Sequence, residues 1–315
     1  MCGRSEYLKK PAHLAPETFR VILKKIRPYK MTFSGLGEPF MHPNLLAMVK
    51  QAKQTGCSIN TTTNGTLLTP AQCEAIVHSG LDLIKISIDG ATPETYQRIR
   101  GEDKFLTVID GLKMLANAKK RLNSVTPYIR LNYVVSQYNA GEMAATVQLA
   151  GTLGVDAVYF QPLEMVGIEQ RKDRLVGDLR YDEFSQYIEH ALNTARQFQV
   201  NTNLDGLQKN LPVYWDKYQP QGGQSNNRIC ILPWFSAYVT VDGFVRPCCS
   251  FSQTNVNLGN ILTTDMLDIW NGKSYQHFRK AIRIGKRPYP ICVNCVPQRF
   301  LDIVRASGVL PGFLT

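Results

Sequence analysis

The segment Leu83-Ile84-Lys85-Ile86-Ser87-Ile88-Asp89-Gly90-Ala91-Thr92-Pro93 combines a short strand, a turn and the start of a helix. Its first six residues are rich in isoleucine, which favours a strand. Asp89-Gly90 is typical of a turn, and Thr92 followed by Pro93 is typical of a helix cap and a first helical turn. The segment therefore predicts one βα unit.

The same order of strand and helix recurs on both sides of this segment. Helical periodicity is clear from Pro16, and again between residues 105 and 115. The expected strands are Met31–Ser34, Ser58–Thr63, Leu83–Ile88, Tyr128–Val135 and Ala157–Gln161. Strands that alternate with helices of about 10–15 residues predict βαβ units and a parallel sheet. The expected fold class is α/β.

Length and composition are those of a core-forming protein. With 315 residues, of which 44% are hydrophobic and 19% charged, the chain predicts one large domain plus a smaller one. It has no run of about 20 apolar residues, so we expect no membrane span. Met1-Cys2-Gly3-Arg4 lacks the apolar run of a signal peptide. Eight cysteines without an export signal indicate reduced thiols and metal ligands, which favours the cytoplasm.

The net charge of +11 does not define a nucleic-acid-binding class. Lysine and arginine are scattered through the predicted helices, and no basic run is interleaved with aromatic residues. A solvated basic surface is therefore the favoured interpretation.

Four cysteines near the C-terminus are candidate metal ligands: Cys230, Cys248, Cys292 and Cys295. Four thiolates can hold a tetrahedral zinc ion or an iron–sulfur cluster. Only the last two form a close pair, which favours a cluster, with structural zinc as the alternative. Cys249 adjoins Cys248, so either could be the ligand, and the spacing of four residues between Gly243 and Cys248 favours Cys248.

This region resembles a known module. The twelve-residue spacer between Cys230 and Gly243, and the four residues before Cys248, are similar to the C-terminal SPASM or "twitch" module of radical S-adenosylmethionine (SAM) enzymes. Later segments follow in the order of that module: Leu258–Ile261, Asp268–Asn271, Phe278-Arg279 and Cys292–Cys295. The resemblance implies one auxiliary [4Fe–4S] cluster, with Cys248 rather than Cys249 as the ligand. It also implies two domains, a radical SAM core at 1–215 and the module at 216–315.

Polar and Gly-rich residues follow the predicted strands in turn. In a barrel of parallel strands the working residues collect at the strand C-terminal ends. Here these residues are Gly35–Pro39, Thr63-Asn64-Gly65, Ser87 with Asp89, and Arg130 with Asn132. Each alone is typical of a turn or a helix cap, but their order indicates a site.

The series resembles the radical SAM core, a partial (β/α)6 TIM-like barrel. Gly35-Leu36-Gly37-Glu38-Pro39 is similar to the family's GGEP-type motif. The resemblance implies that Glu38 and its loop hold the amino group of SAM. It also places Ser87 and Asp89 near the ribose, and Arg130 near the carboxylate. The implied SAM-binding residues are Gly35, Gly37, Glu38, Pro39, Thr63, Asn64, Ser87, Asp89, Arg130 and Asn132.

The N-terminus departs from the family pattern Cys-x3-Cys-x2-Cys, whose thiolates bind a [4Fe–4S] cluster. Met1-Cys2-Gly3 resembles only its last part, which makes Cys2 a candidate ligand. The two earlier cysteines and the first barrel strand are not in the sequence, so we expect a core cut inside its signature. A start codon placed too late and a truncated gene product are the two explanations. Cys57 and Cys73 are interpreted as small buried residues.

The resemblance implies a radical SAM oxidoreductase that cleaves SAM reductively and abstracts a substrate hydrogen. It implies a peptide or small-molecule substrate and an electron donor such as flavodoxin or ferredoxin, and it singles out no further catalytic residue. A truncated, catalytically incompetent iron–sulfur or zinc protein is the alternative. Nucleic acid and membrane partners are not expected.

Overall fold

The computed structural model describes residues 12–163, 178–218, 230–293 and 295, so Cys2 lies outside the described residues. The chain divides into two compact units. In the described part, unit 1 comprises residues 27–163 and 178–218, and unit 2 comprises residues 12–26 and 230–295. Each unit has its own sheet. None of the described helices has the length and apolar character needed to cross a bilayer.

The sheet of unit 1 has six parallel strands in sequential order. They are β1 (Lys30–Phe33), β2 (Ser58–Thr63), β3 (Leu83–Ser87), β4 (Tyr128–Val135), β5 (Ala157–Pro162) and β6 (Asn201–Thr202). This confirms the expected α/β fold with a parallel sheet. Strand β6 was not predicted, because two residues are too short to show a period.

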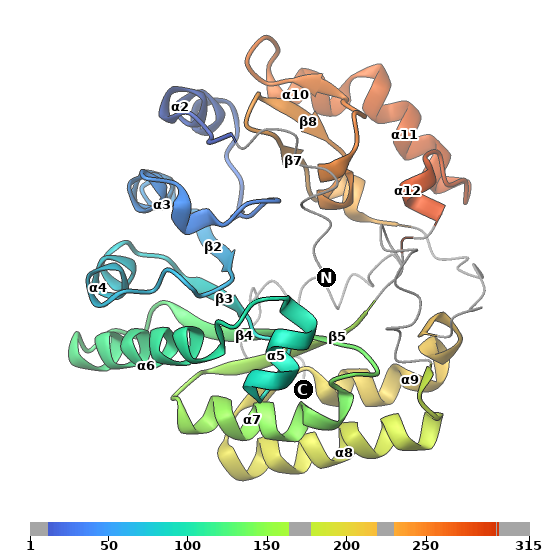
Figure 1. Cartoon of the computed structure of the whole chain (residues 1–315). Coiled ribbons are helices and arrows are strands. Elements are labelled where there is room, and N and C mark those ends of the chain that lie inside the picture. The colour runs from blue at the N-terminus through green and yellow to red at the C-terminus, as the bar shows by residue number, and fades with distance from the viewer. Residues whose placement is uncertain (1–11, 164–177, 219–229, 294, 296–315) are drawn as a thin grey trace. The chain divides into compact units, whose positions relative to one another are not determined.

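Helices connect the strands, and one more helix follows β6. They are α3 (Leu45–Lys53), α4 (Pro70–His78), α5 (Pro93–Arg100), α6 (Phe105–Arg121), α7 (Met143–Thr152), α8 (Tyr181–Phe198) and α9 (Leu204–Tyr218). Figure 1 shows α3, α4, α6, α7 and α8 along one side of the strands. Because each strand pairs with the next in sequence, every crossover returns on the same side, as in a barrel-type βα fold.

The two faces of this sheet differ in chemistry. Side chains that alternate toward the helices are buried aliphatic residues, such as Ile59, Ile84 and Ile129, all 0% exposed. The opposite side, here called the polar face, carries Lys30, Thr32, Asn60, Thr62, Lys85, Ser87, Arg130 and Asn132. The helices therefore bury one face, and the other is available for ligand chemistry.

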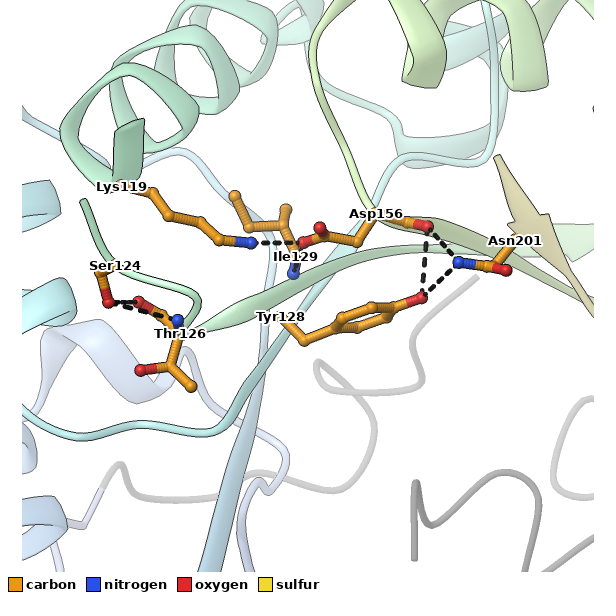
Figure 2. A network of polar contacts seen from close by, with 7 residues as sticks. All are labelled: Lys119, Ser124, Thr126, Tyr128, Ile129, Asp156 and Asn201. Carbon is orange, nitrogen blue, oxygen red and sulfur yellow. Dashed lines mark hydrogen bonds and ion pairs between the residues drawn. The ribbon is translucent and has the colours of Figure 1, made fainter. Parts of the chain in front are cut away.

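Asp156, just before β5, joins three elements at the start of the sheet (Figure 2). Its Oδ2 accepts from Lys119 Nζ at 2.8 Å and from the backbone N–H of Ile129 at 2.7 Å. Its carbonyl oxygen accepts from Tyr128 Oη and Asn201 Nδ2, both at 3.2 Å. One residue thereby fixes α6, β4 and the start of β6.

Asp82, just before β3, repeats this arrangement two βα units earlier. Its Oδ2 accepts from the backbone N–H of Ile59 at 2.7 Å, and both carboxylate oxygens accept from Lys53 Nζ at 2.8 Å. Each aspartate therefore joins the lysine of a helix to the second residue of the neighbouring strand.

We expect Asp156→Ala to lower the free energy of unfolding by about 1–3 kcal/mol, because it leaves a buried N–H without an acceptor and a mostly buried lysine without its partner. Chemical denaturation measures this loss. Asp110→Ala is the matched control, since Asp110 forms an exposed pair with Lys113 on α6 and such pairs contribute little. Equal effects of the two substitutions would show that the Asp156 contacts are not stabilising.

Unit 2 contains a small antiparallel sheet and four helices among its described residues. The strands are β7 (Tyr238–Val239), β8 (Phe244–Arg246) and β9 (Gly259–Asn260), and the helices are α2 (Pro16–Lys25), α10 (Met266–Asn271), α11 (Lys273–Arg283) and α12 (Pro290–Val293). A turn at Val241-Asp242-Gly243 joins β7 and β8. Gly243 has φ +79°, and a Cβ there would lie 2.7 Å from Leu262 Cγ, so the turn requires glycine.

Helix α2 belongs to unit 2, although the sequence places it in the core at 1–215. Ile22 packs into the apolar core formed with Val245, Ile261 and Tyr275. Lys25 Nζ donates to the carbonyl of Ile261 at 2.9 Å. The apolar face of this helix is therefore covered by residues from the far end of the sequence.

We expect Ile22→Ala to destabilise unit 2 by about 2–5 kcal/mol, the usual cost of removing a buried isoleucine side chain. Ile284→Ala is the control, because Ile284 is 59% exposed in the same unit. Proteolysis at cleavage sites within unit 2, monitored against temperature, measures the difference. A variant that is cut no faster than the control would contradict the packing of α2 in this core.

Candidate functional site

Glu38 joins the loop after β1 to the end of β2. Its Oε1 accepts from Thr63 Oγ1 at 2.6 Å and from the backbone N–H of Phe40 at 3.2 Å. Its Oε2 accepts from the backbone N–H of Asn64 at 2.8 Å. Three of the residues that the sequence selected, Glu38, Thr63 and Asn64, therefore meet at one point.

The loop around Glu38 fits an ammonium group. A carboxylate has about four acceptor positions, and the chain's own donors use three of them. Gly35 and Gly37 are exposed, and a Cβ placed on Gly37 would meet no atom within 4 Å. A ligand can therefore approach the loop backbone while its ammonium donates to Glu38 Oε2. Pro39 follows as the first residue of a short 3-10 helix, Pro39–Met41.

The Asn64 side chain stabilises the turn after β2. Its Oδ1 accepts from the backbone N–H and the hydroxyl of Thr66, at 2.9 and 2.8 Å. Thr63 Oγ1 accepts from the backbone N–H of Gly65 at 3.0 Å. These contacts hold the Asn64 N–H in the direction of Glu38.

Both carboxylate oxygens of Asp89 accept hydrogen bonds from other residues of the chain. Its side chain is buried, its Oδ2 accepts from Arg100 at 2.9 Å and its Oδ1 accepts from the backbone N–H of Val134 at 2.7 Å. Burial raises the pKa of Asp89, and the charge of Arg100 opposes this shift. The geometry gives Asp89 the role of joining the end of β3 to α5 and β4. Its contact with the SAM ribose stays a prediction.

Ser87, Arg130 and Asn132 lie on the polar face. Ser87 is paired in register with Asn132, whose Oδ1 accepts from Arg130 Nε at 3.1 Å. The Arg130 guanidinium lies over the ring of Tyr159, 4.7 Å from its centroid. Arg130 is two residues further from the end of β4 than Asn132, so its side chain starts deeper in the sheet.

Four thiols line one cavity in unit 2: Cys230, Cys248, Cys292 and Cys295. The other walls are mostly apolar, formed by Leu232, Pro233, Phe251, Phe278, Ile282 and Ile291. Cys248 is buried, whereas Cys249 is exposed and does not line the cavity. The geometry therefore favours Cys248 as the ligand. Among the described residues, no three His, Cys, Asp or Glu side chains are grouped closely enough to hold a single metal ion.

Burial favours the protonated form of three of these thiols, Cys230, Cys248 and Cys292. Burial raises the pKa of Cys248 to about 12 and that of Cys292 to about 11. The thiolate is the form that ligates metals, so binding of iron has to displace these protons. Arg287 also lines the cavity, and its charge opposes the burial effect on the pKa of Cys230 and Cys292. The donor set fits an iron–sulfur cluster.

The sequence analysis did not select Asn60, Lys85 or Arg287. Alternation along the strands could have placed Asn60 and Lys85 on the face of Arg130, whereas no sequence signal marks Arg287. Cys57 and Cys73 are 1% and 0% exposed, as expected for small core residues.

Two family models match this chain. The radical SAM superfamily model matches residues 1–134, and the SPASM iron–sulfur cluster-binding domain model matches residues 230–296. The chain belongs to the radical SAM superfamily, and it is an iron–sulfur enzyme of the oxidoreductase type. More narrowly, it carries a SPASM domain, and its cofactors are SAM and [4Fe–4S] clusters.

Curated relatives agree with this assignment. The tungsten-containing aldehyde ferredoxin oxidoreductase cofactor-modifying protein of Pyrococcus furiosus is 24% identical over 98% of this chain and 86% of its own length. A probable GTP 3',8-cyclase of Saccharolobus islandicus is 32% identical over 49% of this chain. The chain spans about half the length of the cyclases, with 47% covered in that relative.

Solved structures share the fold. Native anSMEcpe with bound AdoMet has a TM-score of 0.61 and 18% identity, covering 89% of this chain and 79% of its own. Streptococcus suis SuiB bound to the precursor peptide SuiA has a TM-score of 0.65 and 15% identity, covering 97% and 70%. The parallel sheet of unit 1 is thus the TIM-like barrel sheet of radical SAM proteins.

Proposed function

We propose that this enzyme oxidises a peptide or small-molecule substrate by hydrogen abstraction, with Cys230, Cys248, Cys292 and Cys295 holding the auxiliary cluster. The observation that carries the proposal is the mostly apolar cavity that all four thiols line. A cluster there can accept the electron left on the substrate, or anchor the substrate pocket.

The residues of unit 1 bind and orient SAM in this proposal. Glu38 accepts from the ammonium group, and Thr63 and the Asn64 N–H hold the carboxylate in place. Ser87 presents a polar group at the end of β3, and Asn132 presents one at the position of β4 that is paired with Ser87. When bound, SAM and the cluster beside it supply the radical that removes a hydrogen atom from the substrate.

The relatives support both substrate classes. The Pyrococcus furiosus relative is named for modifying a cofactor, and SuiB was solved with a precursor peptide. A reduced flavodoxin or ferredoxin is the class of electron donor that we propose. The cytoplasm is the proposed compartment, because seven described cysteines are free thiols.

Reductive cleavage of SAM tests the proposal. The protein, expressed with any in-frame coding sequence upstream of Met1, is reconstituted anaerobically with iron and sulfide and then reduced with dithionite. We expect 5′-deoxyadenosine and methionine, measured by liquid chromatography. A fully reconstituted protein that releases neither product would overturn the proposal.

Glu38→Gln tests the binding role separately. The amide keeps the length of the side chain but places an NH2 group where the carboxylate accepts hydrogen bonds. We expect the Kd for SAM to rise at least about tenfold, a loss of about 1.4 kcal/mol. An unchanged Kd would remove Glu38 from the SAM site.

A further inference from the structure

Two cations are directly opposed on the polar face. The parallel register of β3 and β4 pairs Lys85 with Arg130. Like charges at paired positions of neighbouring strands destabilise a sheet. Burial, and after it the charge of Arg130, lowers the pKa of Lys30, at the start of β1, to about 8. Three cations therefore act on this part of the polar face.

Asn60 adds a buried donor for which the described part of the chain provides no acceptor. Its Oδ1 accepts from Lys85 Nζ at 3.0 Å. Because a lysine only donates, this bond fixes the orientation of the amide. Asn60 is 0% exposed, and its Nδ2 has no hydrogen-bond partner among the residues that the structure describes. A buried donor without an acceptor destabilises the protein, so a ligand that accepts from it is bound more tightly.

Within the described part of the chain, the Arg130 side chain makes its hydrogen bond and its ring contact with neutral groups. Its partners in the described part of the chain are the Asn132 side chain and the Tyr159 ring. The aspartates around the same sheet form their described ion pairs with other cations: Asp82 with Lys53, Asp89 with Arg100 and Asp156 with Lys119. An arginine with partly unused donors suits a bidentate anion.

We propose that Asn60, Lys85 and Arg130 bind an anionic group of the substrate, a phosphate or a carboxylate. The anion accepts from Asn60 Nδ2 and from the guanidinium, and its charge offsets the repulsion between Lys85 and Arg130. The proposal rests on the proposed function, because it treats the ligand as the substrate of the same enzyme.

The proposed anion site and the proposed SAM contacts lie at different positions along the strands. The proposed SAM contacts lie at the strand ends, at Glu38 and at the paired Ser87 and Asn132. Arg130 is two residues deeper along β4, about 6–7 Å, and the Asn60 position is deeper again. The sequence analysis assigned Arg130 to SAM; we assign it instead to the substrate.

Binding of inorganic phosphate to the full chain, measured by calorimetry, is the first test. We expect one phosphate per chain, with at least about tenfold weaker binding in Arg130→Gln and in Lys85→Met. Lys113→Met is the control with the same charge change, because Lys113 is an exposed residue of α6. No binding to the unmodified protein, or an equal loss in the control, would overturn the proposal.

Asn60→Asp gives a readout that does not depend on a ligand. The variant places a carboxylate beside Lys85 and removes the unpaired NH2 group. We expect it to raise the melting temperature and to weaken phosphate binding, since the site then holds its own anion. If Asn60 is only a core residue, burial of a carboxylate lowers the melting temperature instead.

Competition with SAM tests whether the anion that binds at this site belongs to the substrate or is the carboxylate of SAM. We expect phosphate to bind equally well in saturating SAM, and Arg130→Gln to leave the Kd for SAM within about twofold. Displacement of phosphate by SAM would assign the subsite to SAM and overturn the proposal. Release of 5′-deoxyadenosine without phosphate binding would reject only this subsite, not the proposed function.

Discussion

Replacing Cys248 by alanine is expected to remove the auxiliary cluster. The thiol lies in the cavity with Cys230, Cys292 and Cys295, and three thiolates leave one iron without a protein ligand. Iron and sulfide analysis, with electron paramagnetic resonance of the reduced protein, measures the loss. The remaining signal should come only from the cluster that binds SAM.

Cys249→Ala is the matched control for this experiment. Cys249 is the next residue and is exposed, so its loss should leave the iron content unchanged. The opposite pattern, with iron lost from the Cys249 variant and kept in the Cys248 variant, would contradict the assignment. Zinc in place of iron in the purified protein would favour the structural-zinc alternative.

Asp89→Ala is expected to destabilise unit 1 by about 3–5 kcal/mol, the usual cost of breaking a buried ion pair. It leaves the mostly buried Arg100 without its carboxylate and the backbone N–H of Val134 without its acceptor. Asp89 also has φ +56°, a backbone conformation that aspartate and asparagine tolerate better than alanine. Chemical denaturation measures the change.

A double variant separates the ion pair from the backbone. Adding Arg100→Met to Asp89→Ala removes the unpaired charge and should recover part of the loss. If Asp89→Ala is as stable as the unmodified protein but no longer binds SAM, then Asp89 is the ribose contact that the sequence predicts. The measurement therefore decides between the two roles.

Most of the fold of unit 1 could be predicted from the sequence. The segments Ser58–Thr63 and Tyr128–Val135 were predicted with the bounds that the structure shows, because β-branched residues and alternation mark them. The place of α2 could not be predicted. Its helical period is clear, but the period does not say that Ile22 meets Val245 and Ile269.

The site was predicted less completely than the fold. Spacing selected the cysteines, and the structure adds that Cys248 is buried while Cys249 is exposed. The pairing of Lys85 with Arg130 depends on the register of two strands separated by α5 and α6, which no local pattern reveals. The ion pair of Asp89 depends in the same way on tertiary contacts.

The membership of α2 in unit 2 has a consequence for the order of folding during synthesis. Lys25 and its acceptor Ile261 are 236 residues apart, so the ribosome releases α2 long before the residues that cover it. The apolar face of α2 stays uncovered while unit 1 is being made, and a chaperone can bind it in that interval. We therefore expect unit 2 to complete its core after release of the chain, and iron–sulfur insertion at the four thiols to follow as a late step of maturation.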